Sequence, residues 1–367
     1  MIETDFVTGK MSAPAYELTM SGESITAKIA PRLISLTLTD NRGYEADQLD
    51  IELDDSDGQI RLPRRGVSLT LALGWKGEGL LFQKGSFIVD EVEHSGAPDR
   101  ITLRARSADF RQTLNIKREN SYHSTTLGDI VKTIAARHNL KPALSDELAK
   151  TVIDHVDQTN ESDGSFMTRL AQQEGAIAAV KEGNLLFIRQ GQGKTASGRR
   201  LPALTIVRKD GDQHRFSLVD RGAYTGVSAG WLNTREPKKK EPVKVKRKRR
   251  KTPPKKAGEP EQKQGDYLIG TDENVLVLGH TYANKQNAER AVKAAWGKIQ
   301  RGVASFSIQL ARGRADLYTE MPVKVSGFKA EIDEADWVLT TVTHMLNDSG
   351  YTTAVELEVK VDDLNME

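Results

Sequence analysis

The chain contains no cysteine, and this absence excludes several kinds of site. Without a thiol, its 367 residues can form no disulfide, no cysteine-ligated zinc site, no iron–sulfur cluster and no thiol nucleophile. Long apolar runs are also missing, since no stretch approaches the roughly 18 apolar residues of a membrane span. The first 20 residues lack the basic and apolar regions of a secretion signal. We therefore expect folding in a reducing cytosol, without stable membrane insertion.

Charge is nearly balanced over the chain but unevenly distributed. The net charge is +2, yet residues 236–263 carry 13 Lys and Arg against four Glu. The rest of the chain holds 40 basic and 47 acidic residues and is therefore negative. The positive charge thus belongs to one segment, which argues against a basic folded face for nucleic acid. Because this segment is rich in proline and poor in large apolar residues, we expect a disordered loop over 236–263.

Alternation of apolar and polar residues predicts β-strands in most of the chain. The pattern runs through five short stretches between residues 33 and 106, separated by Gly, Pro and Asp turns, and resumes beyond residue 200. Many short strands at near-regular spacing favour an antiparallel barrel or sandwich. We expect a mainly β fold, with a first β domain over residues 1–113 and a second over 200–367, which the loop 236–263 interrupts.

Helical periodicity sets residues 114–199 apart as a small α+β insert. Apolar residues recur at helical spacing over 127–135, and Thr126 precedes them as a candidate N-cap. A second helix is expected to begin near Ser162, and the apolar runs on either side of KEGN at 181–184 predict a hairpin. A further amphipathic helix, over 288–299, is expected within the second β region.

The segment GQGKTASG at 191–198 resembles a phosphate-binding loop only superficially. Such a loop needs a glycine five residues before the glycine that precedes the lysine, and Ile188 occupies that position. No helix follows to offer its N-terminus to a phosphate. A glycine-rich linker is the favoured interpretation.

No residue stands out as catalytic, cofactor-binding or metal-binding, and we expect none. The seven histidines show no HxH or HExxH spacing; they are residues 94, 123, 138, 155, 214, 280 and 344. His138 closes the apolar face of its helix, where a packed histidine is favoured over a ligand. Asp54 and Asp55 lie in the turn DDSDG, where short polar side chains bond to the backbone. No GxSxG motif supports serine chemistry.

The basic run KVKRKRRK at 244–251 leaves three interpretations open. Its charges could bind phosphates of nucleic acid, since lysine and arginine release counterions whatever the sequence. They could also contact an acidic partner or a lipid surface. The run contains no aromatic residue for stacking on bases, and a solvated loop is favoured.

Several long motifs, in order, resemble the late control protein D family of contractile-tailed bacteriophages. They include LTLTDNRGYEADQLDIELDDSDGQIRLPRRG from residue 36, TTLGDIVKTIAARHNL from 125, DQTNESDGSFMTRLA from 157 and RGVASFSIQLARGRADLYTEMPVKVSGFK from 301. The resemblance extends from about residue 30 to the last strand. It implies a baseplate hub, similar to the base of the type VI secretion spike protein, with two related antiparallel, tube-like β-barrels per chain.

The resemblance also implies the partners and the location. Such a hub is a homotrimer whose six barrels form a ring between a trimeric tail spike protein and the hexameric tail tube protein. Tape-measure and other baseplate proteins are expected neighbours, and phage DNA would pass transiently through the channel. The expected location is the virion tail baseplate, assembled in the cytoplasm of the bacterial host. The family implies no cofactor and no catalytic residue.

Two other functions remain as alternatives. A hub with cell-wall lytic activity would need a lytic domain of its own, and the insert at 114–190 lacks a recognisable acid/base pair. A DNA-binding regulator of late genes would need the basic segment to fold as a reader of DNA. Five prolines, at 237, 242, 253, 254 and 260, oppose a helix there.

We predict that residues 236–263 are dispensable for folding. Replacing them with a short Gly/Ser linker should leave the melting temperature nearly unchanged, because the segment cannot pack a core. Limited trypsin digestion of the free protein should cut first within 238–256 and leave two fragments that migrate together. A large fall in melting temperature, or protection of the segment from trypsin, would contradict this prediction.

Overall fold

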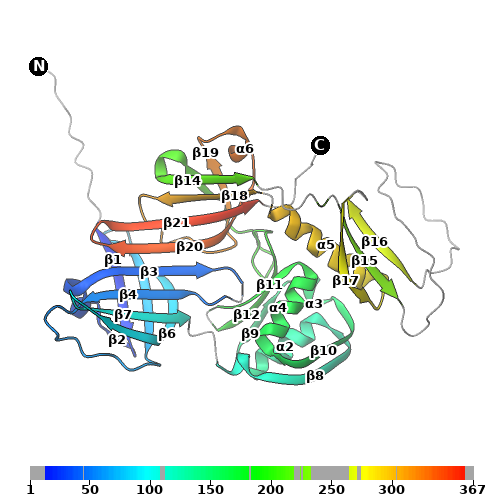
Figure 1. Cartoon of the computed structure of the whole chain (residues 1–367), viewed down its shortest axis with the longest axis horizontal. Helices are drawn as coiled ribbons and strands as arrows, with labels where there is room; N and C mark the ends of the chain where they lie inside the picture. Colours follow the sequence, from blue (N-terminus) through cyan, green and yellow to red (C-terminus); the bar gives the residue numbers. More distant parts are fainter. Residues whose placement is uncertain are drawn as a thin grey trace, which may run out of the picture.

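The computed structural model describes residues 13–43, 45–107, 112–181, 183–218, 224, 226–232, 264–270, 274–302 and 304–359. Most of its regular structure is antiparallel strand, with a smaller mixed α/β part beside it (Figure 1). The expectation of a mainly β fold with an α+β insert is confirmed. No helix in these ranges is long and apolar enough to cross a membrane.

The first β region places the predicted alternating stretches in antiparallel strands. In the strand over 48–54, Leu49, Ile51 and Leu53 are buried while the residues between them are partly exposed. A period of two is expected when one face of a strand covers a core. The elements are β1 (Pro14–Met20), β2 (Glu23–Ser24), α1 (Thr26–Ile29), β3 (Leu33–Asn41), β4 (Gln48–Asp54), β5 (Ser68–Trp75), β6 (Phe82–Ser95) and β7 (Arg100–Ser107).

The insert has its own core between two helices and two small sheets. As predicted, Thr126 caps the first helix by accepting a hydrogen bond from the Asp129 amide, and Ser162 caps the second in the same way. The hairpin around 181–184 is confirmed by antiparallel pairing of β11 with β12. The elements are β8 (Lys117–Thr126), α2 (Leu127–Arg137), β9 (Lys141–Leu144), α3 (Asp146–Ala149), β10 (Val152–Ser162), α4 (Asp163–Glu174), β11 (Ala176–Lys181) and β12 (Asn184–Arg189).

The second β region surrounds a core that contains Phe306 and Trp337. The indole N–H of Trp337 donates to the carbonyl of Ile332 at 2.9 Å, so this buried ring has no unsatisfied polar atom. The elements are β13 (Leu204–Val207), β14 (Gly211–Leu218), β18 (Ala304–Leu310), β19 (Pro322–Ser326), α6 (Ala330–Asp333), β20 (Trp337–Asn347) and β21 (Gly350–Val359).

The two β regions share one sheet, which the alternating pattern did not reveal. β20 pairs antiparallel with β3, with Leu346 opposite Leu36 and His344 opposite Leu38 (Figure 1). The resulting 13-stranded sheet runs from β14 at one end to β2 at the other. Alternation shows which face of a strand is buried but not which strand lies beside it, so a pairing across about 300 residues could not be read from the pattern.

A separate three-stranded sheet forms beside the second β region. It contains β15 (Gly226–Leu232), β16 (Gln264–Gly270) and β17 (Val275–Tyr282), and α5 (Lys285–Arg301) packs against it. The helix expected over 288–299 is present as α5. Val227, Ala229 and Trp231 of β15 pack with Ala288 and Val292 of α5 in a core of their own, apart from the core around Trp337. The apolar face of α5 therefore covers the apolar face of this sheet.

The basic segment 236–263 itself lies outside the described residues. The strands before and after it are described, and Leu232 pairs with Gln264 in antiparallel register. The two ends of the connection are therefore neighbours, which is the arrangement that a short replacement linker needs.

We predict that Gly313→Ala destabilises the contact between the two β regions. A Cβ at this position would lie 2.4 Å from the ring of Tyr351, and the Gly313 carbonyl accepts a hydrogen bond from Trp75 Nε1 at 2.8 Å. Overpacking of this kind costs about 1 to 3 kcal/mol of unfolding free energy. Urea unfolding measures the loss. Gly279→Ala is the matched control because nothing lies within 4 Å of its Cβ, and an equal loss in both variants would contradict the prediction.

Candidate functional site

The carboxylates of the DDSDG turn hold the turn and do not form a cleft. Asp54 Oδ1 accepts a hydrogen bond from the amide of Ser56, and Asp55 Oδ1 accepts one from the amide of Ile60, both at 2.9 Å. Hydrogen bonds from Ser56 lower the pKa of Asp54. Both side chains therefore act as backbone acceptors, as the sequence indicated.

The glycine-rich segment 191–198 packs against the second β region. The Gly191 amide donates to Glu320 Oε2 at 2.8 Å, and an added Cβ at Gly193 would meet the ring of Pro322 at 3.2 Å. Lys194 and Arg200 form an isolated β-bridge. The backbone donor that a phosphate-binding loop would need at Gly191 is thus already paired with a carboxylate.

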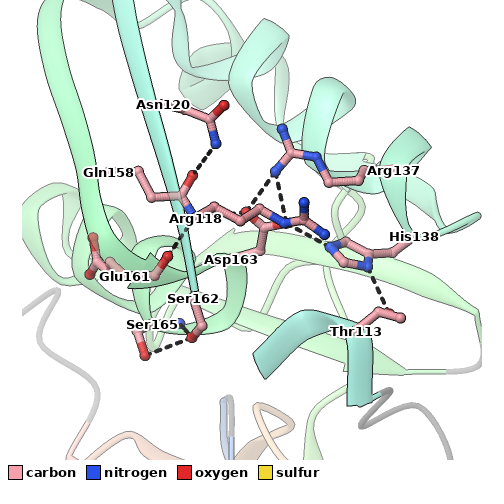
Figure 2. A network of polar contacts seen from close by, with 10 residues as sticks. All are labelled: Thr113, Arg118, Asn120, Arg137, His138, Gln158, Glu161, Ser162, Asp163 and Ser165. Atoms are coloured by element: carbon pink, nitrogen blue, oxygen red, sulfur yellow. Dashed lines mark hydrogen bonds and ion pairs between the residues drawn. The ribbon is translucent and has the colours of Figure 1, made fainter. Parts of the chain in front are cut away.

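His138 belongs to a buried polar cluster around Asp163 (Figure 2). Asp163 is fully buried at the first turn of α4. Arg137 Nη1 donates to both of its oxygens at 2.7 and 2.8 Å, His138 Nε2 lies 2.7 Å from Oδ2, and Gln158 Nε2 donates to Oδ1 at 2.8 Å. Arg118 Nε lies 3.3 Å from Oδ2. A charged group buried in this way is stable because every oxygen has cationic or polar partners.

The hydrogen bonds around Asp163 determine its protonation state. Burial alone would raise its pKa, but hydrogen bonds from Gln158, Arg137 and His138 outweigh burial and lower the pKa. The other ring nitrogen of His138, Nδ1, lies 3.0 Å from Thr113 Oγ1. The polar atoms of Asp163 and His138 are thus hydrogen-bonded or ion-paired with other side chains of the chain. The cluster joins α2, α4, β8 and β10 of the insert to Thr113, directly before it.

A second group of charges lies where the insert meets the first β region. Lys181 Nζ, at the end of β11, lies 2.5 Å from Asp40 Oδ1 and 2.9 Å from Asp47 Oδ2. Burial and the neighbouring Asp40 raise the pKa of Asp47 to about 6, although Lys181 opposes the shift. Burial lowers the pKa of Lys181, but the two carboxylates outweigh it and raise that pKa. One lysine therefore connects the two parts of the chain.

Arg42 makes the equivalent connection to the second β region. Its Nε lies 2.6 Å from Glu320 Oε1, and its Nη1 pairs with Glu358. Arg301 Nε, at the end of α5, lies 3.7 Å from the same Glu358 oxygen. Burial raises the pKa of Glu320 despite the nearby arginine. These ion pairs and those of Lys181 together form what we call the inter-region charge cluster. Its members come from the first β region, the insert, α5 and the second β region; they are Asp40, Arg42, Asp47, Lys181, Arg301, Glu320 and Glu358.

A cavity of about 570 Å³ opens beside the inter-region charge cluster. Its wall combines apolar side chains, among them Phe82, Ile177 and Leu317, with Lys84 and Lys181. Burial lowers the pKa of Lys84 to about 8, and its Nζ donates to the Leu317 carbonyl at 3.0 Å. Within the described ranges, no group of three or more His, Asp or Glu side chains is arranged to hold a metal.

The sequence revealed only part of these clusters. The sequence indicated a helix start near Ser162, and it placed His138 on an apolar helix face. Nothing in the spacing showed that Arg118 and Arg137 meet Asp163, or that Lys181 meets Asp40. Partners so far apart in the chain are set by the packing of separate elements.

We predict that Asp163→Asn lowers the unfolding free energy by about 3 kcal/mol at pH 7, because it removes the buried charge that the partly buried Arg118 and Arg137 face. Asp129→Asn, in the exposed first turn of α2, is the control and should cost much less. The pKa of Asp163 is lowered on folding, so its contribution is complete above the unfolded aspartate pKa of about 3.9 and disappears as pH falls through the folded-state value. Urea unfolding between pH 7 and pH 2 measures both effects; equal losses in the two variants would show that the buried cluster is unimportant.

Comparison with known proteins identifies the family. Residues 41–350 match the family described as phage tail baseplate hub (GPD). The chain is 55% identical to the "Probable baseplate hub protein" of Escherichia phage P2, over 99% of this chain and 97% of the relative. It is 54% identical to the protein of the same name from Escherichia phage 186, over 97% and 95%.

Solved structures show the same fold at low sequence identity. The 43 kDa tail protein of prophage MuSo2 from Shewanella oneidensis is 13% identical with a TM-score of 0.66, and the match covers 94% of this chain and 98% of that one. The E. coli c3393 protein, a component of the type VI secretion system, is 13% identical with a TM-score of 0.55, covering 90% and 74%. These structures support the fold, and the match over residues 41–350 together with identity above half to two hub proteins shows that the chain belongs to the phage tail baseplate hub family.

Proposed function

We propose that this baseplate hub protein forms a trimeric ring that joins the trimeric tail spike to the hexameric tail tube and surrounds the channel for DNA. Membership of the baseplate hub family is the observation that carries the proposal. The E. coli type VI secretion component with the same fold is described as similar to the T4 tail proteins gp27 and gp5. That likeness supports a hub that contacts a spike.

The symmetry argument rests on the two β regions. Three copies of a chain with two such regions present six of them, so a trimer can match a three-fold spike on one side and a six-fold tube on the other. The single 13-stranded sheet supports this arrangement because it fixes the two regions relative to each other. Among the described strands of this sheet, β14, β2 and β13 each pair with a single neighbour, and each offers an edge that a neighbouring copy could cover.

We propose the following domain division for this role. Residues 1–113 and 200–367 form the two tube-like β domains, and residues 114–199 form the insert. The insert has a core of its own, which supports its boundaries. The second β region has a core around Trp337, but its Ala315, Leu346 and Tyr351 pack in the core of the first β region, so the two β regions are closely joined. The small unit of β15, β16, β17 and α5 falls within the third range, as does the basic segment 236–263.

The proposed role is structural and not enzymatic. The family supports this, and the buried ionisable groups in the Asp163 cluster and the inter-region charge cluster are paired with other residues of the chain. We propose the tail spike, the tail tube, the tape-measure protein and other baseplate proteins as partners. The basic segment 236–263 would contact acidic groups on the tape-measure protein or passing DNA.

We predict that the complex with the spike protein contains three copies of this chain. The two proteins should be co-expressed and purified, and multi-angle light scattering should give the mass of a three-to-three complex. The spike alone and the hub alone are the controls, because the free hub could remain monomeric. A stable complex with two hub chains related by a two-fold axis would contradict the proposed ring.

A further inference from the structure

Two exposed histidines face each other across the ribbon formed by β8 and β10. His123 and His155 are directly opposite in the antiparallel register. Their Nδ1 atoms lie 3.0 Å apart, and their rings are nearly parallel, with centroids 4.5 Å apart and an angle of 20°. The two side chains come from positions 32 residues apart, which is why no metal-binding spacing was visible in the sequence.

The surrounding residues orient one of these rings. His155 Nε2 lies 3.0 Å from Asp157 Oδ2, and the other carboxylate oxygen of Asp157 accepts a hydrogen bond from Ser121 Oγ at 2.6 Å. A carboxylate beside one ring nitrogen favours a proton there and leaves the lone pair on the other nitrogen. Asp157 therefore favours the form of His155 whose unprotonated Nδ1 accepts a hydrogen bond from His123 Nδ1–H. A metal ion bound between the two nitrogens would replace that proton, which would leave for solvent.

We propose that His123 and His155 bind a divalent transition-metal ion, such as Zn²⁺ or Ni²⁺, through their Nδ1 atoms. Two imidazole nitrogens bound at about 2.0–2.1 Å to a tetrahedral ion are about 3.3–3.4 Å apart. The observed separation of 3.0 Å is close to this value. Rotation about the χ2 torsions, which have broad minima, would turn the two nearly parallel rings so that both lone pairs point at one ion. Imidazole ligands select Zn²⁺, Ni²⁺ or Cu²⁺ over Mg²⁺ and Ca²⁺, which prefer oxygen.

The site has an open geometry because the chain supplies two ligands. The remaining coordination positions face solvent, where His155 is about half exposed. Asp157 acts on the far side of the His155 ring and therefore positions a ligand without binding the ion itself. Metal bound here would link β8 to β10 within a two-stranded ribbon, an arrangement that is only marginally stable alone.

Titration of the full-length chain with NiCl₂ and ZnCl₂ by isothermal calorimetry tests the proposal. The absence of cysteine helps, since no thiol competes for the ion. We expect binding of one Ni²⁺ per chain, no binding of MgCl₂, and at least about tenfold weaker Ni²⁺ binding in His123→Ala and in His155→Ala, because each removes one of two ligands. Asp157→Asn should weaken binding by about tenfold through loss of its effect on His155.

The controls separate loss of the site from loss of the fold. His280→Ala removes an exposed histidine on β17 and should bind Ni²⁺ as the unchanged chain does. The double variant His123→Ala/His155→Ala should bind Ni²⁺ at least as weakly as either single variant, because it leaves no imidazole ligand at the site. Excess NiCl₂ should raise the melting temperature of the unchanged chain by binding the folded state, and should not raise that of His123→Asn.

Clear outcomes would overturn the proposal. They are absence of Ni²⁺ and Zn²⁺ binding at tens of micromolar protein, or equal binding by the His123 and His280 variants. If His155→Ala fails to fold, His123→Asn still decides the question through calorimetry and melting. None of these measurements depends on trimer formation, so the metal site and the proposed ring can fail independently.

Discussion

The pairing of β20 with β3 is the interaction on which the rest of the structure depends. It places the first and second β regions in one sheet and fixes their relative orientation through a continuous ladder of backbone hydrogen bonds. Trp75, Tyr351 and Gly313 pack at the same junction, where the two rings lie 5.5 Å apart. A shared sheet holds two β regions more stiffly than a linker between two domains.

Charged side chains complete the connection that the sheet begins. Lys181 joins the insert to Asp40 and Asp47, and Arg42 joins the first β region to Glu320 and Glu358. Ion pairs of this kind contribute little net stability when buried, but removal of one member leaves the other uncompensated. They therefore favour one arrangement of the parts over others. The buried Asp163 cluster has the same effect within the insert.

The polar groups described above are used in two different ways. The carboxylates and the histidine that the sequence singled out hold a turn or a helix junction. The exposed pair of His123 and His155 differs. Its Nδ1 atoms contact each other at the surface, whereas the buried groups contact a side chain of opposite charge. A surface ribbon is a position where an ion can bind without change to the sheet that carries the two β regions.

Local patterns in the sequence determined the elements, and tertiary structure decided how they are joined. The alternating strands, the Thr126 and Ser162 caps and the apolar helix faces follow from interactions within a few residues, so they could be predicted. Four contacts could not be predicted in this way. They are the pairing of β3 with β20, the separate sheet around Trp231, the contacts of Arg118, Arg137 and Gln158 with Asp163, and the contact of His123 with His155. Each of these contacts joins residues far apart in the chain. Only the packing of complete elements brings them together, because a strand or helix pattern specifies a buried face and not its partner.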